Sequence, residues 1–551
     1  MKFLNTRRFR YGGMSVVITA LVIVTIILLN VLFTSLSGHF LWQIDMTQEK
    51  IFTLSANCKQ LLDDTFEDVE QYRQEQGMTE PLKVTFKFCD LEDNIMSNLE
   101  QRYILMTAKE LANRYSEYID IEFINTWDNP TAVDRYKTSV HTVINKSDII
   151  IASGTEHRIF NVNNFFERSK DGTPWAYLGE KRFASAILAV TQTESPIAGI
   201  LMGHGETFTD TALVDLLQTA GYEPMIIDDL VTQDIPEDCR LLVCYNPTED
   251  FLAADSVASD ISEIRKLDEF LAGENHSLMV FMSPSAPALP NFEEYLELWG
   301  ISFTRYTDPT SGETAPCIVK DSQNALTGDG LTIVGQYETA GSGAKFTEDM
   351  RNVKNPRRVI FKNTMPISLS DQFEIYYGED DGQAFSYGYK SLGNGNSRTV
   401  FNIFSAAKSA TLIANGEQVE KTAKYPYGLM TVSIQSRQTQ EESNLDYFKD
   451  NPDAAFSDQN SYVLACGSVD AMKQAILQSV TYGNQEVLLK AMGEMGKKPV
   501  PLSLPFNVFQ KTTIESLTTT RANAYTVSLV LIPAAIIFGV GTFVIIWRKH
   551  A

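Results

Sequence analysis

Two uncharged, apolar runs, one near each end of the chain, constrain this sequence more than any other feature. Neither Met14–Leu36 nor Tyr525–Trp547 contains a charged residue. As a helix, a run of this length extends about 34 Å, enough to cross the hydrocarbon core of a bilayer. A charged side chain at mid-bilayer costs roughly 2.5–3.5 kcal/mol, so uncharged runs of this length predict transmembrane helices at residues 14–36 and 525–547. Buried helices of a soluble core are the alternative.

The flanking cations predict the orientation of these helices. Lysine and arginine favour the cytoplasmic side of a membrane. The cations before the first run are Lys2, Arg7, Arg8 and Arg10, whereas only Lys50 lies close behind it. We therefore expect a two-pass protein of the cell membrane, with residues 1–13 and 548–551 cytoplasmic and the large domain between the helices extracytoplasmic.

The region between the two runs is strongly acidic. It holds all 69 Asp and Glu residues and 40 of the 46 Lys and Arg residues, a net charge of about −29. Such a surface repels nucleic acid and anionic lipid headgroups, so neither is expected as a partner of this domain. The cysteines are scattered, with no CxxC pair and no Cys/His spacing typical of zinc, which favours buried free thiols and no metal site. Cys239 and Cys244 are expected on opposite faces of one strand.

The first part of this region, residues 45–192, reads as an α/β unit. Pro81–Phe88 alternates apolar and polar residues and predicts a strand, with further strands at Ile119–Ile124 and Asp148–Ala152. Helices are expected around Asn98–Tyr118 and at Trp175–Thr191.

Residues 195–300 have the alternating strand and helix pattern of a doubly wound sheet. The expected strands are Ile197–Met202, Pro224–Asp228, Leu241–Tyr245 and Leu278–Met282, and the expected helices are Thr211–Ala220 and Ile261–Leu271. Short apolar runs of this kind indicate parallel strands covered on both faces. The overall expectation is an α/β ectodomain between two transmembrane helices.

Residues 301–510 form a more β-rich, mixed α/β unit in this interpretation. A hairpin is expected from Phe373–Tyr377 and Ala384–Tyr389. Leu429–Ile434 and Tyr462–Cys466 predict further strands, and Gln485–Met495 predicts a helix.

The turn formed by Gly203, His204, Gly205 and Glu206 is the most suggestive candidate site. It follows a predicted strand and precedes a predicted helix, and ligands of doubly wound sheets bind at the carboxyl edge. In one interpretation His204 and Glu206 contact a ligand or partner. In the other, the glycines only make the turn and both side chains bond to neighbouring backbone.

No catalytic residue is expected. A cysteine nucleophile needs a strained, glycine-flanked turn, whereas Cys244 lies within a strand and Cys89 is followed by Asp90 without such glycines. A membrane-tethered hydrolase is therefore the least favoured of the functions considered.

Four stretches of this chain resemble the gliding-motility-type auxiliary proteins of bacterial ABC transporters. They are Asp45–Ser55, Ala186–Thr191 leading to the GHGE turn, Tyr482–Gln485, and the terminal run with its closing Trp547-Arg548-Lys549. The region from about residue 301 to residue 436 matches least.

The resemblance implies a non-catalytic domain related in fold to class I glutamine amidotransferases, without their catalytic residues and without a cofactor. It also implies an accessory role beside an ABC permease and ATPase, with assembly into homo- or hetero-oligomers left open. A free-standing ligand-binding or sensor protein is the alternative function.

Two further groups of residues are assigned tentative roles. A coupling role between the first membrane helix and the domain is expected for Asp45, Thr47, Lys50, Thr53, Leu54 and Ser55. Asn30 and Pro533, within the two apolar runs, are candidates for contacts at a membrane interface between helices.

Overall fold

The computed structural model describes most of the chain, in segments separated by short gaps. The described residues are 20–32, 51–137, 143–169, 171–192, 196–206, 208, 211–253, 261–339, 343–344, 346–352, 356–380, 383–420, 426–437, 459–479, 481–496, 500, 504, 507–509 and 519–550. They form two compact units. Unit 1 comprises Met1–Glu167 and Leu178–Asn507, and unit 2 comprises Arg168–Tyr177 and Val508–Ala551.

The prediction of two transmembrane helices is wrong for the described part of the chain. No helix among these residues is both long enough and apolar enough to cross a membrane. Near the N-terminus, the structure describes a helix over residues 20–32. Near the C-terminus, α14 (Thr519–His550) contains Pro533 within its length. The two-pass location, the cytoplasmic termini and the extracytoplasmic placement depended on these helices and are withdrawn.

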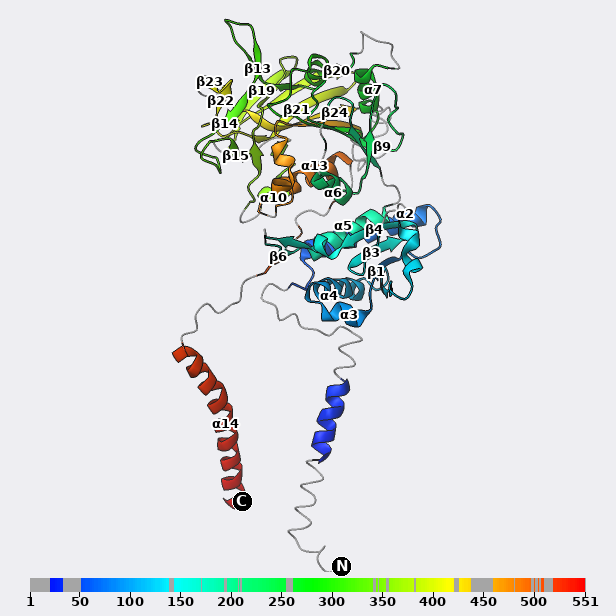
Figure 1. Ribbon diagram of the computed structural model, residues 1–551, viewed down its shortest axis with the longest axis vertical. Helices are drawn as coiled ribbons and strands as arrows, with labels where there is room; N and C mark the ends of the chain where they lie inside the picture. The colour runs from blue at the N-terminus through cyan, green and yellow to red at the C-terminus, as the bar shows by residue number, and fades with distance from the viewer. Residues whose placement is uncertain are drawn as a thin grey trace, which may run out of the picture. The chain divides into compact units, whose positions relative to one another are not determined.

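A four-stranded sheet organises the N-terminal part of unit 1 (Figure 1). Its order is β2-β1-β3-β4, formed by Ile119–Phe123, Val84–Phe88, Asp148–Ser153 and Glu156–Asn161 respectively. β1 and β2 are parallel, and β3 is antiparallel to β1. Three of these strands were predicted from their alternating or apolar patterns.

Helices pack against this sheet through aromatic side chains. The helices of this part are α2 (Ala56–Glu75), α3 (Glu92–Ser97), α4 (Leu99–Arg114) and α5 (Gly179–Thr191). The ring of Phe183 on α5 lies 4.8 Å from that of Phe86 on β1. Asn98 caps α4 by accepting the backbone N–H groups of Glu100 and Gln101. The predicted helix start at Trp175 is wrong, because this residue lies in β6 (Pro174–Tyr177).

The second sheet of unit 1 combines a parallel half with an antiparallel half. Its main order is β19-β20-β21-β24-β25-β10-β9-β7-β8. The parallel strands are β7 (Ile197–Leu201), β8 (Glu223–Ile227), β9 (Cys239–Tyr245), β10 (Ser277–Phe281) and β25 (Gln459–Cys466). The antiparallel strands are β19 (Glu374–Asp380), β20 (Gln383–Gly393), β21 (Asn396–Ser405) and β24 (Gly428–Arg437). Strands expected in residues 195–300 and 301–510 therefore share one sheet.

Helices cover both faces of the parallel half, as the apolar strands predicted. On β9, Leu241, Val243 and Tyr245 point into a core shared with α6 (Thr211–Thr219) and α13 (Asn484–Gly496). Leu242 and Cys244 point into a second core with α7 (Glu263–Leu271) and α8 (Pro290–Leu298). Figure 1 shows α6 and α13 together on one side of this sheet. The mixed α/β character of the chain is thus established.

An irregularity in β9 corrects the prediction for its two cysteines. The register with β7 shifts between Ile197 and Ala198, which face Cys239 and Leu241 respectively. The extra residue on β9 turns Cys239 to the same core as Cys244, because a bulge reverses the alternation of side chains. All six cysteines are buried and free, which confirms the expectation of free thiols.

The remaining elements are short. They are η1 (Pro130–Tyr136), η2 (Val162–Phe165), β5 (Phe166–Arg168), β11 (Ile301–Phe303), β12 (Arg305–Thr307), β13 (Thr314–Pro316), β14 (Ile318–Lys320), β15 (Thr332–Val334), β16 (Gln336–Tyr337), α10 (Glu348–Arg351), β17 (Ile360–Lys362), β18 (Ile367–Leu369), β22 (Thr411–Ala414), β23 (Glu417–Glu420), η3 (Asp470–Met472), α12 (Gln474–Leu477) and β26 (Asn507–Val508). The hairpin β19–β20 confirms the one expected there.

Candidate functional site

The GHGE turn lies where the order of the parallel sheet reverses. From β7 the chain runs to β8 on one side, then returns to β9 on the other side of β7. Such a reversal opens a crevice at the carboxyl ends of the strands. Both glycines are required here. Gly203 and Gly205 have φ of +108° and +73°, and a Cβ on Gly205 would lie 2.1 Å from the hydroxyl oxygen of Thr248.

The imidazole of His204 is held between two carboxylates. Nδ1 lies 3.1 Å from Oε1 of Glu206, and Nε2 lies 2.9 Å from Oε1 of Glu263 on α7. The backbone N–H of His204 also donates to Oε2 of Glu206 at 2.7 Å. The second oxygen of Glu263 accepts the backbone N–H of Leu252 at 2.8 Å.

The three members of this cluster are buried, with 3% of His204, 6% of Glu206 and 4% of Glu263 exposed. The ring of His204 stacks on that of Phe251 at 3.6 Å. Burial alone would lower the pKa of His204, but its hydrogen bonds and charge interactions with both glutamates outweigh burial and raise the pKa to about 9. At neutral pH the ring is therefore a cation compensated by the two acidic residues.

The cluster supports the loop that follows β9. The carbonyl of His204 accepts the backbone N–H groups of Thr248 and Glu249 at 2.7 and 2.8 Å. The hydroxyl of Thr248 donates to the carbonyl of Gly205 at 3.2 Å. The described polar contacts of His204 and Glu206 are thus all made within the fold, and ligand binding by the GHGE turn itself stays a prediction.

A pocket of about 530 Å³ opens beside this loop, at the carboxyl ends of β9, β10 and β25. It is lined by Tyr245, Asn246, Ser283, Pro284, Ser285, Ile318, Asn363, Val469, Asp470 and Lys473. We call it the carboxyl-edge pocket. Its position is the one at which ligands bind in open α/β sheets.

One wall of the carboxyl-edge pocket consists of hydroxyl and amide groups. Asn246 follows β9 with φ of 54°, a left-handed conformation that asparagine tolerates better than most residues. Its backbone N–H donates to the carbonyl of Phe281 at 2.7 Å. The hydroxyl of Ser283 donates to Oδ1 of Asn246 at 2.7 Å and lies 2.6 Å from the hydroxyl of Ser285. These bonds orient the polar groups before any ligand arrives.

Another part of the pocket lining carries one carboxylate and one ammonium group. Nδ2 of Asn363, which follows β17, donates to Oδ2 of Asp470 at 2.7 Å. Nζ of Lys473 lies 2.5 Å from Oδ1 of the same aspartate. Burial alone would raise the pKa of Asp470, but the hydrogen bonds from Lys473 and Asn363 outweigh it and hold the pKa below its ordinary value. The carboxylate is ionised and paired at neutral pH.

The expected coupling segment is described only from residue 51 onward. Asp45, Thr47 and Lys50 lie outside the described residues. Leu54 is buried. Ser55 caps α2 by accepting the N–H of Cys58 at 3.1 Å, and its hydroxyl donates to Oε2 of the buried Glu180 on α5 at 2.6 Å. Ser55 is thus the N-cap of α2, and the coupling role expected for this segment stays a prediction.

The two residues assigned to a membrane interface lie in helices. Asn30 belongs to the helix over residues 20–32, and Pro533 lies inside α14. Because the prediction of transmembrane helices is wrong for the described residues, the predicted role of Asn30 and Pro533 at a membrane interface is not supported.

The cysteines considered as nucleophiles are buried within strands or at their ends. Burial raises the pKa of the Cys244 thiol well above its ordinary range, with a further contribution from the charge of Glu206. Burial, together with the charge of Asp148, raises the pKa of Cys89 to about 12. Neither thiol has the thiolate character that nucleophilic attack requires.

Sequence reasoning missed most of the carboxyl-edge pocket. Asn246, Ser283 and Asp470 follow three predicted strands, and that shared position was an available signal. Asn363 and Lys473 carried no comparable signal, since nothing in the sequence shows that β17 and η3 meet at this edge.

Comparisons with known proteins identify no family. No family model matches the chain, and no curated protein matches it. Among solved structures, a similar chain is described as "mmIFT52 N-terminal domain"; it is 8% identical, and the match covers 55% of this chain and 99% of that chain with a TM-score of 0.34. The resemblance to gliding-motility-type auxiliary proteins of ABC transporters is not supported by these comparisons.

Proposed function

We propose that this protein binds a small, uncharged, polar ligand in its carboxyl-edge pocket and performs no chemistry on it. The observation that carries this proposal is the lining of the pocket. Its hydroxyl and amide groups lie at the carboxyl ends of parallel strands, and its carboxylate and ammonium, Asp470 and Lys473, neutralise each other. Hydroxyl and amide groups recognise uncharged polar molecules through hydrogen bonds.

Binding is favoured over catalysis by how the reactive side chains are used. His204 is protonated near neutral pH and held by two acidic residues, so it is a poor general base. The thiols of Cys89 and Cys244 are buried with raised pKa. A pocket without an activated nucleophile or base nearby suits a binding protein.

As the assembly that this protein serves, we propose an ABC transporter, with the protein as an accessory subunit. Support for this step comes from the sequence resemblance in Asp45–Ser55 and in the GHGE turn. The competing proposal is a free-standing ligand-binding protein, which shares the pocket but needs no transporter.

A crosslinking pull-down of the tagged full chain from its native cells tests the assembly. Recovery of an ABC ATPase together with a permease, identified by mass spectrometry and absent from a tag-only control, supports the accessory role. Failure to recover either subunit, although both are detected in the same cells, contradicts the accessory role and leaves the free-standing binding protein.

A further inference from the structure

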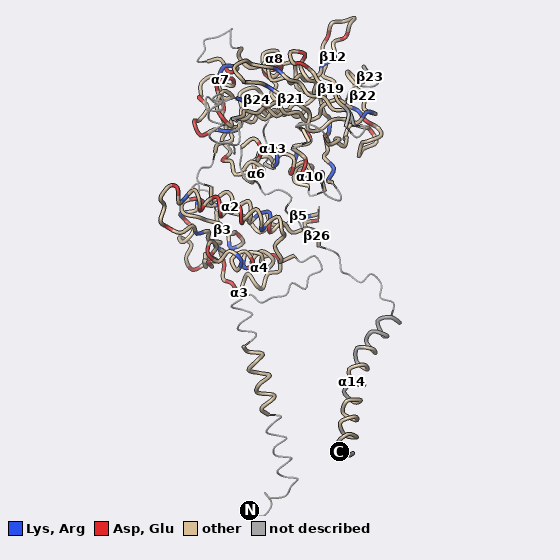
Figure 2. Tube along the Cα trace, turned by 180° about the vertical axis from the view of Figure 1, so that it is seen from behind, with Lys and Arg blue, Asp and Glu red and all other residues tan. Residues whose placement is uncertain are grey.

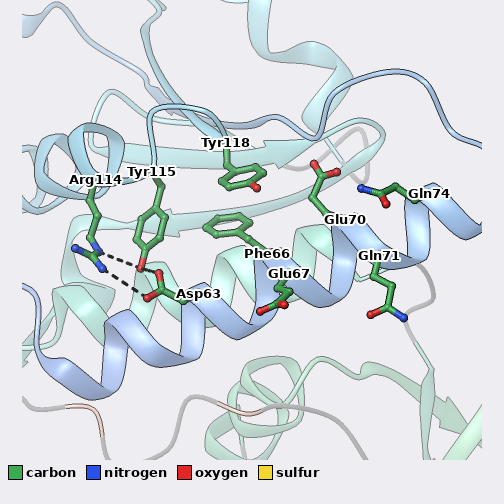
Figure 3. A pocket seen from close by; sticks show the side chains of 9 residues that line it. All are labelled: Asp63, Phe66, Glu67, Glu70, Gln71, Gln74, Arg114, Tyr115 and Tyr118. Carbon is green, nitrogen blue, oxygen red and sulfur yellow. Dashed lines mark hydrogen bonds and ion pairs between the residues drawn. The ribbon is translucent and has the colours of Figure 1, made fainter.

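A second hollow, of about 850 Å³, runs along one side of α2 (Figure 3). It is lined by Asp63, Phe66, Glu67, Glu70, Gln71 and Gln74 of α2 and by Arg114, Tyr115 and Tyr118, which follow or end α4. We call it the α2 groove. It belongs to the N-terminal part of unit 1 and is separate from the carboxyl-edge pocket in its residues and its chemistry.

One end of the α2 groove already holds a guanidinium group. The side chain of Arg114 lies over the ring of Tyr115, 5.5 Å from its centroid, and 3.5 Å from a carboxylate oxygen of Asp63. The hydroxyl of Tyr115 donates to the same carboxylate at 2.8 Å. A cation over an aromatic ring and beside a carboxylate is a stable arrangement.

The next turns of α2 again place an aromatic ring near carboxylates, but here no cation lies over the ring among the described residues. Tyr118 stacks on the buried Phe66, with ring centroids 4.4 Å apart and planes at 8°. Glu67 and Glu70 lie one turn and two turns beyond Asp63 on the same side of the helix. Figure 3 shows Glu70 rising from α2 beside Tyr118. Within the described part of the chain, neither glutamate takes part in an ion pair with a lysine or arginine.

The charges near Tyr118 are negative. Burial raises the pKa of Tyr118, and the charges of Glu70 and Glu117 raise it further. Two acidic residues, Glu70 and Glu117, therefore lie near this half-buried aromatic ring. Figure 2 shows that acidic residues continue along α2. Their combined negative charge attracts a cation before it reaches the residues that line the groove.

We propose that the α2 groove docks an arginine-containing basic segment of a partner protein. One arginine stacks its guanidinium on Tyr118 and pairs with Glu67 and Glu70, as Arg114 does with Tyr115 and Asp63. The amide side chains of Gln71 and Gln74 continue the groove and hydrogen-bond the backbone of the bound segment.

Arginine fits this groove better than lysine for geometric reasons. A guanidinium is planar, so it can lie on the ring of Tyr118 while its N–H groups face carboxylates at the edge. An ammonium is a compact, strongly hydrated point charge and cannot make both contacts equally well. This inference goes beyond the proposed ligand binding and does not depend on it.

Fluorescence anisotropy with the purified full chain tests the proposal. The probes are two fluorescein-labelled hexapeptides, one of six arginines and one of six lysines, at physiological ionic strength. The test variant is the double substitution Glu67→Gln and Glu70→Gln. The matched control is Asp64→Asn with Asp68→Asn, which removes the same charge from the same helix at exposed positions outside the groove. Circular dichroism checks that each variant is folded.

The proposal predicts tighter binding of the arginine peptide than of the lysine peptide. It also predicts about tenfold weaker arginine-peptide binding for the Glu67/Glu70 variant and nearly unchanged binding for the control. Tyr118→Phe, which keeps the ring, should bind like the original chain, and Tyr118→Leu should bind more weakly. Equal losses in the test and control variants, or equal affinities for the two peptides, would show attraction by overall charge alone and overturn the proposal.

Discussion

The imidazole Nε2 of His204 lies 2.9 Å from a carboxylate oxygen of Glu263, a residue 59 positions later in the chain. This contact joins the loop after β7 to the first turn of α7. Since the carbonyl of His204 also holds the loop after β9, the contact fixes one border of the carboxyl-edge pocket.

The His204 cluster should make stability depend on pH. The folded pKa of His204 is about 9, above the ordinary value of 6.5, so the protonated ring stabilises the fold. This contribution is complete below pH 6.5 and is lost as pH rises through about 9, on the order of 3 kcal/mol in total. Urea denaturation between pH 6 and pH 9.5 measures the loss.

His204→Gln removes the titrating group and should flatten this pH dependence. His157→Gln is the control, because His157 contacts the carbonyl of Tyr136 and, among the described residues, no carboxylate. An equally steep fall in the free energy of unfolding for His204→Gln would contradict the assignment.

A second buried titratable group, the carboxyl of Glu338, should make the stability of the fold depend on pH in a lower pH range. Burial raises the pKa of Glu338 from 4.5 to about 7, even though the hydroxyl of Ser405 donates to it. The protonated carboxyl is favoured in the folded state. Its contribution to stability is complete below pH 4.5 and is lost as pH rises through about 7. Glu338→Gln should therefore be more stable than the original chain at pH 8, by up to about 3 kcal/mol, and not at pH 5. Thermal denaturation at both values decides, and a loss of stability at pH 8 would refute this account of Glu338.

Removing the hydrogen bond that links the start of α2 to α5 should lower the stability of the fold. Ser55→Ala removes the helix cap and a hydrogen bond to the buried Glu180, and we expect a loss of about 1–3 kcal/mol. Ser97→Ala, whose hydroxyl makes an exposed bond to the carbonyl of Asn94, is the control. Chemical denaturation compares the two, and equal, small losses would show that the link contributes little.

The cysteines should resist modification in the folded protein. All six are buried, and burial, as the largest cause, raises the pKa of Cys58 and Cys466 to about 12. We expect negligible labelling by a maleimide at pH 7.5 and six labels per chain in denaturant. Mass spectrometry counts the labels. Rapid labelling of the folded chain, or fewer than six labels in denaturant without a reductant, would contradict this description.

Much of the sheet could be predicted because local patterns determine strands. The short apolar runs that became β7, β9 and β10 indicated parallel strands covered on both faces, and helices do cover both faces. The bulge at the start of β9 could not be predicted, since it depends on the register with β7. The two transmembrane helices predicted from the apolar runs were wrong, because no helix among the described residues is long and apolar enough to cross a membrane.

The candidate site was harder to predict than the sheet. The GHGE turn stood out locally, but its partner Glu263 lies in another helix. Asn363 is hydrogen-bonded to Asp470, which lies 107 positions later in the chain. Neither partnership follows from spacing, periodicity or composition, because the neighbours are brought together by β17, β25 and the folded sheet.

The central claim is that the carboxyl-edge pocket binds a polar ligand without changing it. The most direct measurement is mass spectrometry of small molecules that copurify with the full chain, compared with Ser285→Trp, which fills the pocket, and with Ser311→Trp, an equal change at an exposed turn outside it. We expect an uncharged polar molecule in equal amounts with the original chain and Ser311→Trp, absent from Ser285→Trp and unchanged after incubation. No bound molecule, equal retention by Ser285→Trp, or conversion of the molecule on incubation would contradict the claim.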